Sequence, residues 1–209
     1  MRNYEKPKNA KGLCRYLGMI NFYPRFMQNS AKILMPLYDL LAEHNKLPTN
    51  ALINRTQEQE HAFNKSKNDL VQAALLAYPA PNEEIFLAAD ASDIVVAAVL
   101  YQKIHSQLIE PVGFFSKRLD RAQIKWTIFS RELPAIYLGA KHFSYFLQGT
   151  NFTIQTDHQA IVSAAASSRP SDIPRKVHHL HYLTTMSPNW QYITGSNDVT
   201  IDSLPPCHR

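Results

Sequence analysis

The sequence predicts an α/β fold in which a mixed sheet with flanking helices follows a small, mainly helical module. Three observations lead to this prediction. The 209 residues are 45% hydrophobic and 11% aromatic, which is enough to build a folded core. Residues 1–80 place apolar side chains at helical spacing, whereas residues 81–209 begin with short apolar runs of strand length. A turn containing Pro79 and Pro81 separates the two patterns, so we expect domains at 1–80 and 81–209.

The helical module has two recognisable parts. Between residues 10 and 42, apolar side chains recur three and four positions apart, and Pro24 and Pro36 interrupt the pattern, so short helices are expected. Thr56 and Gln59 have the spacing of a capping box, in which each side chain bonds the backbone of the other residue. A further helix is therefore predicted to begin here and to run toward the proline turn.

The second domain is predicted to alternate strands and helices. Its strands are expected at residues 85–89, 95–101, 109–116, 152–156 and 190–194. Its helices are expected at residues 127–147, 159–166 and 173–186. The first three strands are close enough in sequence for an antiparallel meander, and the later helices can cover the faces of a mixed five-stranded sheet.

The net charge of +5 arises in the first module. Residues 1–80 hold 11 Lys and Arg against 6 Asp and Glu, whereas residues 81–209 hold 11 of each kind. A basic flank beside a neutral, carboxylate-bearing half is typical of a protein that binds nucleic acid. An ordinary solvated basic surface explains these charges equally well.

The sequence argues against several classes of protein. No apolar run approaches the roughly 18 residues that cross a bilayer, and the polar N-terminal segment does not look like a secretion signal. We therefore expect an intracellular protein, cytoplasmic or nuclear, without a membrane partner. Cys14 and Cys207 are the only cysteines and form no Cys-x-x-Cys pattern, which argues against a disulfide framework and a thiolate zinc site.

Four carboxylates stand where a site at the edge of a sheet is expected. Asp90 and Asp157 each follow an apolar strand, so they emerge together if the two strands run in the same direction. Glu132 lies near the start of the long helix beside Leu133, and Asp202 follows the last strand. Converging carboxylates repel one another unless cations neutralise them, and oxygen ligands suit Mg²⁺ or Mn²⁺. Taken singly, each residue is more typical of a turn, a helix start or a cap.

Six segments of the second domain form a recognisable order. They are residues 87–92 (LAADAS), 99–102 (VLYQ), 111–119 (PVGFFSKRL), 129–137 (FSRELPAIY), 156–158 (TDH) and 197–204 (NDVTIDSL). In this order they resemble the ribonuclease H domain of gypsy-class LTR retrotransposon polyproteins. Residues 16–26, 36–41 and 62–63 resemble the thumb and connecting helices that link polymerase to ribonuclease H in these polyproteins. The resemblance implies a ribonuclease H-like sheet preceded by a reverse-transcriptase thumb/connection module.

The resemblance also implies a nuclease. Asp90, Glu132, Asp157 and Asp202 would hold two Mg²⁺ or Mn²⁺ ions and cut the RNA strand of an RNA:DNA hybrid by a two-metal mechanism. The polymerase portion of the parent polyprotein is an expected partner. The sequence has no Asp-Asp pair, so it lacks the Tyr-x-Asp-Asp signature of a polymerase site.

Basic residues and histidines are the candidates for nucleic-acid contact. A cationic stretch leads into the long helix and consists of Lys117, Arg118, Arg121, Lys125 and Arg131. These side chains are expected to contact phosphates, and a solvated basic loop is an equal alternative. His158 is a candidate groove contact beside Asp157. With no cysteine nearby, the histidines at 178, 179 and 181 are expected at the surface or in a groove and not in a metal site.

Three departures from the family pattern bear on activity. The turn after Asp90 has no glycine, Pro134 follows Glu132 closely, and Pro205 and Pro206 would stop a helix near the C-terminal carboxylate. The alternative prediction is therefore a catalytically silent, nucleic-acid-binding remnant of a retroelement polyprotein. An integrase-like transferase fits less well, because Glu132 falls between the two aspartates and not after them.

Overall fold

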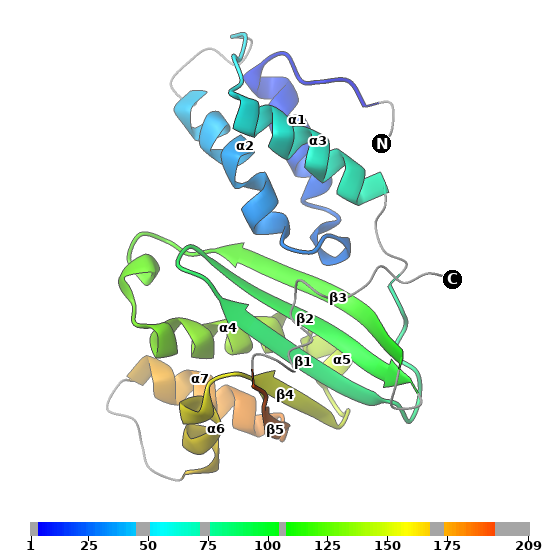
Figure 1. Ribbon diagram of the computed structural model, residues 1–209, viewed down its shortest axis with the longest axis vertical. Helices are drawn as coiled ribbons and strands as arrows, with labels where there is room; N and C mark the ends of the chain where they lie inside the picture. Colours follow the sequence, from blue (N-terminus) through cyan, green and yellow to red (C-terminus); the bar gives the residue numbers. More distant parts are fainter. Residues whose placement is uncertain (1–3, 45–50, 72–75, 105–107, 168–173, 195–209) are drawn as a thin grey trace. The chain divides into compact units, whose positions relative to one another are not determined.

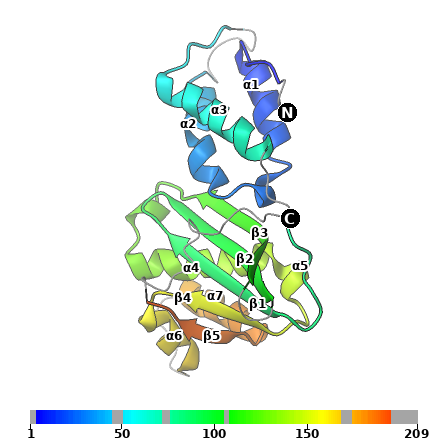
Figure 2. The same ribbon diagram turned by 45° about the vertical axis from the view of Figure 1, so that its right-hand side comes forward.

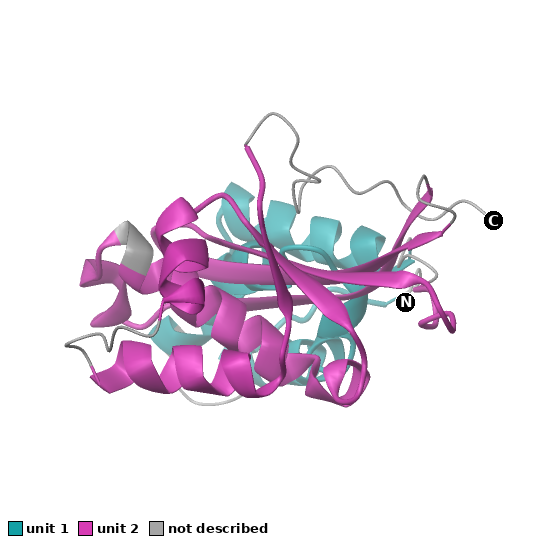
Figure 3. Ribbon diagram, turned by 90° about the horizontal axis from the view of Figure 1, so that it is seen from below, with its two compact units in different colours: residues 1–74 teal, residues 75–209 magenta. Residues whose placement is uncertain are grey.

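The computed structural model describes residues 4–44, 51–71, 76–104, 108–167 and 174–194. The chain divides into two compact units, residues 1–74 and residues 75–209 (Figure 3). The division lies a few residues before the proline turn because the segment leading into that turn bonds to the second unit. Ala77 donates its backbone N–H to the Pro111 carbonyl over 2.9 Å.

The first unit is a group of helices around one small core. It contains α1 (Ala10–Ile20), the short 3₁₀ turn η1 (Pro24–Phe26), α2 (Ser30–His44) and α3 (Gln57–Val71). Its core gathers apolar side chains from all three long helices, including Leu13, Tyr16, Ile20, Leu37 and Phe63.

The predicted capping box opens α3. Thr56 donates its backbone N–H to Gln59 Oε1 over 2.9 Å, and Gln59 donates its backbone N–H to Thr56 Oγ1 over 3.3 Å. These two bonds satisfy backbone donors that have no partner within the helix itself. This part of the sequence prediction is confirmed.

Pro36 does not interrupt its helix, so that prediction is wrong. The helix α2 runs through Pro36 from Ser30 to His44, although proline removes one backbone hydrogen bond. Leu34, Leu37 and Leu40 on the same helix are all buried, and burying their side chains offsets the lost bond. Pro24 lies at the first position of η1, where a proline is tolerated.

The second unit is built on one mixed sheet. Its described strands are β1 (Glu84–Ala91), β2 (Val95–Ile104), β3 (Leu108–Arg118), β4 (Phe152–Thr156) and β5 (Asn189–Tyr192). Their spatial order is β3-β2-β1-β4-β5 (Figure 1). The β1–β2 and β2–β3 pairs are antiparallel, whereas the β1–β4 and β4–β5 pairs are parallel. The mixed five-stranded sheet and its antiparallel meander are therefore confirmed.

Helices cover one face of this sheet. They are α4 (Ile128–His142), α5 (Ser144–Leu147), α6 (Gln159–Ala166) and α7 (Pro174–Thr185), and the 3₁₀ turn η2 (Gln123–Lys125) precedes α4. The helix α4 packs on β1 and β2, and α7 packs against α4 (Figure 2). The long helix expected at 127–147 is divided, because the backbone leaves helical geometry at Phe143, whose side chain is buried in the core.

The contact between α4 and β2 is close because α4 carries a glycine there. A Cβ placed on Gly139 would lie 2.6 Å from the Ala98 Cβ, nearer than two such atoms can approach. Leu133 and Ile136 of α4, together with Leu87 and Ile154 of the sheet, are fully buried around this contact. The helix is thus held against the middle of the sheet.

A buried glutamine holds the segment that leads into the sheet. Gln102 Oε1 accepts the Ala80 backbone N–H over 2.8 Å, and Gln102 Nε2 donates to the Tyr78 carbonyl over 3.2 Å. Its amide also donates to Glu110 Oε2 over 3.1 Å. Gln102 is only 1% exposed and Glu110 only 4%. This small polar network fixes the backbone of residues 78–80 on the sheet.

Candidate active site

Asp90 and Asp157 end up side by side because their strands are parallel neighbours. The β1–β4 ladder pairs Ile85 with Phe152 and continues without a shift to Ala88 with Gln155. Continued by two residues, this register would bring Asp90 beside Asp157, the residue that directly follows β4. Adjacent strands lie about 4.8 Å apart, and side chains at matched positions point to the same face. The sheet thus delivers two exposed carboxylates to one edge, as the sequence suggested.

Glu132 approaches this edge from the covered face of the sheet. It lies in the second turn of α4, and the residue is only 4% exposed. The Ala91 backbone bonds its carboxyl group, and Glu132 Oε2 has no hydrogen-bond partner. Burial, followed by the nearby charges of Asp90 and Asp157, raises the pKa of Glu132 to about 8. Glu132 therefore lies within electrostatic reach of both aspartates.

Three of the four predicted carboxylates are accordingly brought together. The fourth, Asp202, lies outside the described residues. Among the residues that are described, no group of three or more His, Cys, Asp or Glu side chains has the arrangement of a ready metal site. The chemistry of this corner nevertheless suits a divalent cation, because Glu132 offers a buried oxygen without a partner and carboxylates are preferred ligands of Mg²⁺.

Arg131 faces the strand turn that follows Asp90. Its Nη1 donates to Asp93 Oδ1 over 2.6 Å and to the Ser92 carbonyl over 3.1 Å. The arginine side chain is 11% exposed, whereas that of Asp93 is 89% exposed. The sequence predicts that Arg131 contacts phosphate, and in the structure its guanidinium bonds the β1–β2 turn. Nothing in the spacing of Asp93 and Arg131 along the chain indicated this pair.

The β1–β2 turn forms without a glycine. Ser92 Oγ donates to the Val95 carbonyl over 2.9 Å and accepts the Val95 backbone N–H over 3.0 Å. The Ser92 backbone N–H also donates to the Val95 carbonyl over 2.8 Å. None of the residues in this turn has a positive φ. The missing glycine noted in the sequence is therefore no obstacle to the turn.

Pro134 lies inside α4, which begins at Ile128 with Thr127 as its N-cap. A proline at this point cannot donate a hydrogen bond to the Ser130 carbonyl one turn earlier. Glu132 nevertheless points toward the sheet, and Leu133 beside it is fully buried. The proline thus leaves the buried orientation of the glutamate in place.

The remaining cationic residues lie near the same edge of the sheet. Lys117 and Arg118 close β3, where they pair with Val96 and Val95 at the start of β2, and all four candidates in this stretch are exposed. Asp90 pairs with Ala97 one position further along β2. The end of β3 thus lies beside the carboxylate edge. The connection that leads from there to α4 contains Arg121 and Lys125.

The histidines differ in their surroundings. His158 occupies the N-cap position of α6 without a side-chain capping bond, and its Nδ1 lies 3.9 Å from Asp157 Oδ1. His179 is only 8% exposed and stacks on Tyr137 with ring centroids 4.2 Å apart, so the expectation that it lies at the surface is wrong. Burial, followed by the charges of His178 and Arg175, lowers the pKa of His179 to about 4. Sequence alone gave no signal of this, because the helix α7 is polar on average.

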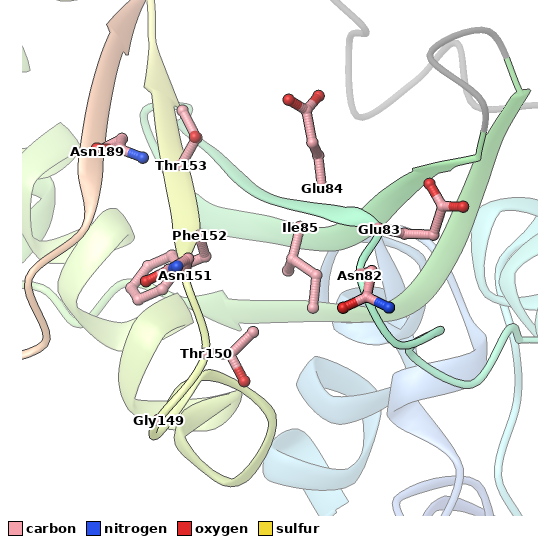
Figure 4. Close-up of a pocket in the computed structure, with 10 residues that line it drawn as sticks. All are labelled: Asn82, Glu83, Glu84, Ile85, Gly149, Thr150, Asn151, Phe152, Thr153 and Asn189. Carbon is pink, nitrogen blue, oxygen red and sulfur yellow. The ribbon is translucent and has the colours of Figure 1, made fainter.

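A separate pocket opens at the other end of the strands (Figure 4). It measures about 460 Å³ and is lined by the first residues of β1, β4 and β5, including Ile85, Phe152 and Asn189. Asp90 and Asp157 lie at the opposite ends of β1 and β4. The pocket is therefore distinct from the carboxylate edge.

Comparison with known proteins agrees with this fold. Residues 56–154 match the family model described as the RNase H-like domain found in reverse transcriptase. The Transposon Tf2-3 and Tf2-4 polyproteins of Schizosaccharomyces pombe are each 28% identical over 203 residues, covering 96% of this chain. The chain spans only 15% of the length of each of these polyproteins.

Solved structures show the same arrangement of elements. A foamy viral protease-reverse transcriptase in complex with an RNA/DNA hybrid has a TM-score of 0.74 at 19% identity, covering 100% of this chain and 29% of the solved chain. The foamy viral protein in complex with double-stranded DNA has a TM-score of 0.74 at 20% identity, covering 95% and 41% of the respective chains. The described helices include none long and apolar enough to cross a membrane. Residues 56–154 thus match the RNase H-like domain found in reverse transcriptase, and nearly the whole chain is similar to one section of the Tf2 transposon polyproteins.

Proposed function

We propose that this chain hydrolyses the RNA strand of RNA:DNA hybrids with the help of divalent cations. One observation supports this function most directly. Asp90 and Asp157 stand at the same end of two adjacent parallel strands, and the buried carboxyl group of Glu132 lies within their electrostatic reach. Three carboxylates from distant parts of the chain have little reason to share one corner unless a cation joins them.

Asp90, Glu132 and Asp157 would hold the cations, and Asp202 is the fourth proposed ligand. Mg²⁺ or Mn²⁺, when bound, supplies an activated water and stabilises the departing 3′ oxygen of the cleaved strand. Glu132 must release its proton before its carboxylate can act as a ligand, because its pKa is raised to about 8 without a cation.

The exposed cations near this edge provide the proposed contacts to the hybrid. Lys117, Arg118, Arg121 and Lys125 would bind phosphates, and His158 would contact the groove beside Asp157. Phosphate contacts of this kind fix the position of the substrate, whereas selection of the RNA strand needs contacts to its 2′-hydroxyl groups. A hybrid partner also agrees with the similar foamy viral protein, which was solved in complex with an RNA/DNA hybrid.

A cleavage assay with matched variants tests this proposal. The full chain is incubated with Mg²⁺ and a hybrid labelled on its RNA strand, and double-stranded RNA and DNA serve as substrate controls. We expect cleavage of the hybrid alone and a loss of at least about 100-fold in Asp157→Asn. Glu84→Gln makes the same acid-to-amide change at the far end of β1 and should leave the rate unchanged.

The same assay separates the proposed nuclease from a silent remnant. Binding of the hybrid without cleavage, at Mg²⁺ and Mn²⁺ concentrations up to about 10 mM, would show that the carboxylates no longer support chemistry. Equal cleavage by the parent and by Asp157→Asn would instead trace the activity to a contaminating nuclease. Either result refutes the proposed function.

A further inference from the structure

Two consecutive residues of α4, Arg131 and Glu132, form hydrogen bonds with the segment that follows Asp90. The Glu132 carboxyl group is bonded by the Ala91 backbone, and Arg131 Nη1 bonds both the Ser92 carbonyl and the Asp93 carboxylate. These contacts join distant parts of the chain, because Ser92 and Arg131 are 39 positions apart. Each of the three residues after Asp90 is therefore hydrogen-bonded to α4: Ala91 to Glu132, and both Ser92 and Asp93 to Arg131.

We propose that Arg131, through Asp93 and the Ser92 carbonyl, is a positioning residue that sets the spacing between Asp90 and Glu132. This inference rests on the proposed use of divalent cations at these carboxylates. It also replaces the expectation that Arg131 contacts phosphate. The proposed role belongs to the pair, because Asp93 directs the guanidinium and Arg131 holds the turn.

The covalent connections make this positioning effective. Asp90 is joined to Ala91 by one rigid peptide unit, and the backbone has only two free torsions per residue. Glu132 is joined to Arg131 in the same way, within a helix whose geometry is regular. Fixing Ser92 and Asp93 against Arg131 therefore leaves few ways for Asp90 to move relative to Glu132.

The state of the arginine side chain favours positioning over substrate contact. Its side chain is 11% exposed, and its Nε is buried without a hydrogen-bond partner. The most exposed part of the pair is the Asp93 carboxylate, which would repel a phosphate group placed there. Both bonds come from one nitrogen, Nη1, whose two hydrogens point in directions fixed by the planar guanidinium, whereas the ammonium of a lysine rotates freely.

A simple stabilising role is the main competing explanation. The pair could hold the β1–β2 turn on α4 without any effect on the carboxylates. Because the Asp93 carboxylate is largely exposed to water, such a role would appear only as a small change in stability. Cation affinity distinguishes the two roles, because only a change in carboxylate spacing alters it.

The deciding experiment measures Mn²⁺ binding to the full chain in the absence of nucleic acid. Titration calorimetry gives the affinity, and paramagnetic broadening of the Ala91 amide signal in NMR spectra locates the ion. We expect Arg131→Gln and Asp93→Asn each to weaken Mn²⁺ binding by about 10-fold, as removal of outer partners of metal ligands commonly does. Arg131→Lys should recover part of this loss. The double variant should bind about as weakly as either single variant, because both remove the same contact.

Arg121→Gln is the matched control from the exposed cationic stretch. It should leave Mn²⁺ affinity unchanged and reduce the salt dependence of hybrid binding, which Arg131→Gln should not do. Unchanged Mn²⁺ affinity in Arg131→Gln would show that the Arg131–Asp93 pair only stabilises the fold. A reduced salt dependence in that variant would make Arg131 a phosphate ligand. Either outcome overturns the proposal, as does a parent chain in which Mn²⁺ leaves the Ala91 signal unbroadened.

Cleavage of the RNA:DNA hybrid is measured separately, so that the proposed nuclease activity and the positioning role can fail independently. A parent chain that binds Mn²⁺ beside Ala91 and fails to cut the hybrid contradicts the proposed nuclease, while the positioning role is still decided by the variants. A parent chain that cuts the hybrid while Arg131→Gln binds Mn²⁺ normally contradicts the positioning role alone.

Discussion

Asp90 and Asp157 lie at the same end of two adjacent parallel strands that are far apart in sequence, and the charges of both raise the pKa of Glu132. The register that produces this pairing is set well before the carboxylates, at Ile85 with Phe152 and at each following pair. A shift of one residue would turn one aspartate to the other face of the sheet. The packing of β1 and β4 therefore determines whether the two carboxylates can act together.

Removal of one aspartate should make Glu132 a stronger acid. The charges of Asp90 and Asp157 add to burial in raising the pKa of Glu132 to about 8. Asp90→Asn should therefore lower this pKa, measured without divalent cations by ¹³C NMR titration of the labelled carboxyl group. Glu84→Gln, a substitution at the far end of β1, should leave the pKa of Glu132 unchanged. An unchanged pKa in Asp90→Asn would mean that the two groups do not interact.

The raised pKa of Glu132 also predicts how stability depends on pH. The folded chain keeps a proton on this group up to about pH 8, whereas the unfolded chain releases it near pH 4.5. The free energy of unfolding should therefore fall as the pH rises from 4.5 to 8. Denaturant unfolding of Glu132→Gln should show a weaker decline over this range than the parent.

His179 should act in the opposite direction. Its pKa is lowered to about 4 in the folded chain from 6.5, so the unfolded chain takes up a proton first as the pH falls. The free energy of unfolding should drop between pH 6.5 and 4, by roughly 1–3 kcal/mol. His179→Gln should reduce this slope in denaturant unfolding, whereas the exposed His181→Gln should not. Equal slopes in all three chains would contradict the burial of His179.

Two glycine-to-alanine changes should have opposite effects. Gly139→Ala places a Cβ 2.6 Å from the Ala98 Cβ and should destabilise the second unit by about 1–3 kcal/mol. Gly18→Ala lies in α1 with nothing within 4 Å of the new Cβ, and should stabilise the first unit by up to about 1 kcal/mol. Hydrogen exchange of amides in each unit measures both effects. A neutral Gly139→Ala would show that α4 can move away from the sheet freely.

Gln102→Leu should loosen the segment that leads into the sheet. It removes the partners of the Ala80 N–H and the Tyr78 carbonyl, which should cost about 1–3 kcal/mol of unfolding free energy. Exchange of the Ala80 amide hydrogen should become faster. Gln159→Leu, at an exposed position of α6, should change stability by no more than about 0.5 kcal/mol. Similar effects of the two changes would argue against the role of the buried amide.

Much of the sheet could be predicted because each strand carries its own local signal. The strand at 152–156 and the helix at 159–166 were placed at their observed bounds, since apolar runs and their flanking residues define both. Short connections predict the meander, and parallel strands predict that Asp90 and Asp157 emerge at the same edge of the sheet. The remaining carboxylate of the site, Asp202, is still a prediction.

Contacts between residues that are far apart in the chain could not be predicted from the sequence. No periodicity links Arg131 to Asp93, since an ion pair between a helix and a turn leaves no local pattern. The continuation of α2 through Pro36 depends on burial of its leucines, which outweighs the local preference of proline. The burial of His179 likewise depends on Tyr137, which belongs to another helix.

The close contact at Gly139 has a consequence for how the second unit can change. Glu132 lies seven residues away on the same helix, which is about 10 Å along its axis. We expect a larger side chain at Ala98 or Gly139 to push α4 away from β2 and to move Glu132 relative to the strand ends. A substitution in the interior of the second unit can therefore change the spacing of Glu132 and the two aspartates while every acidic residue is retained.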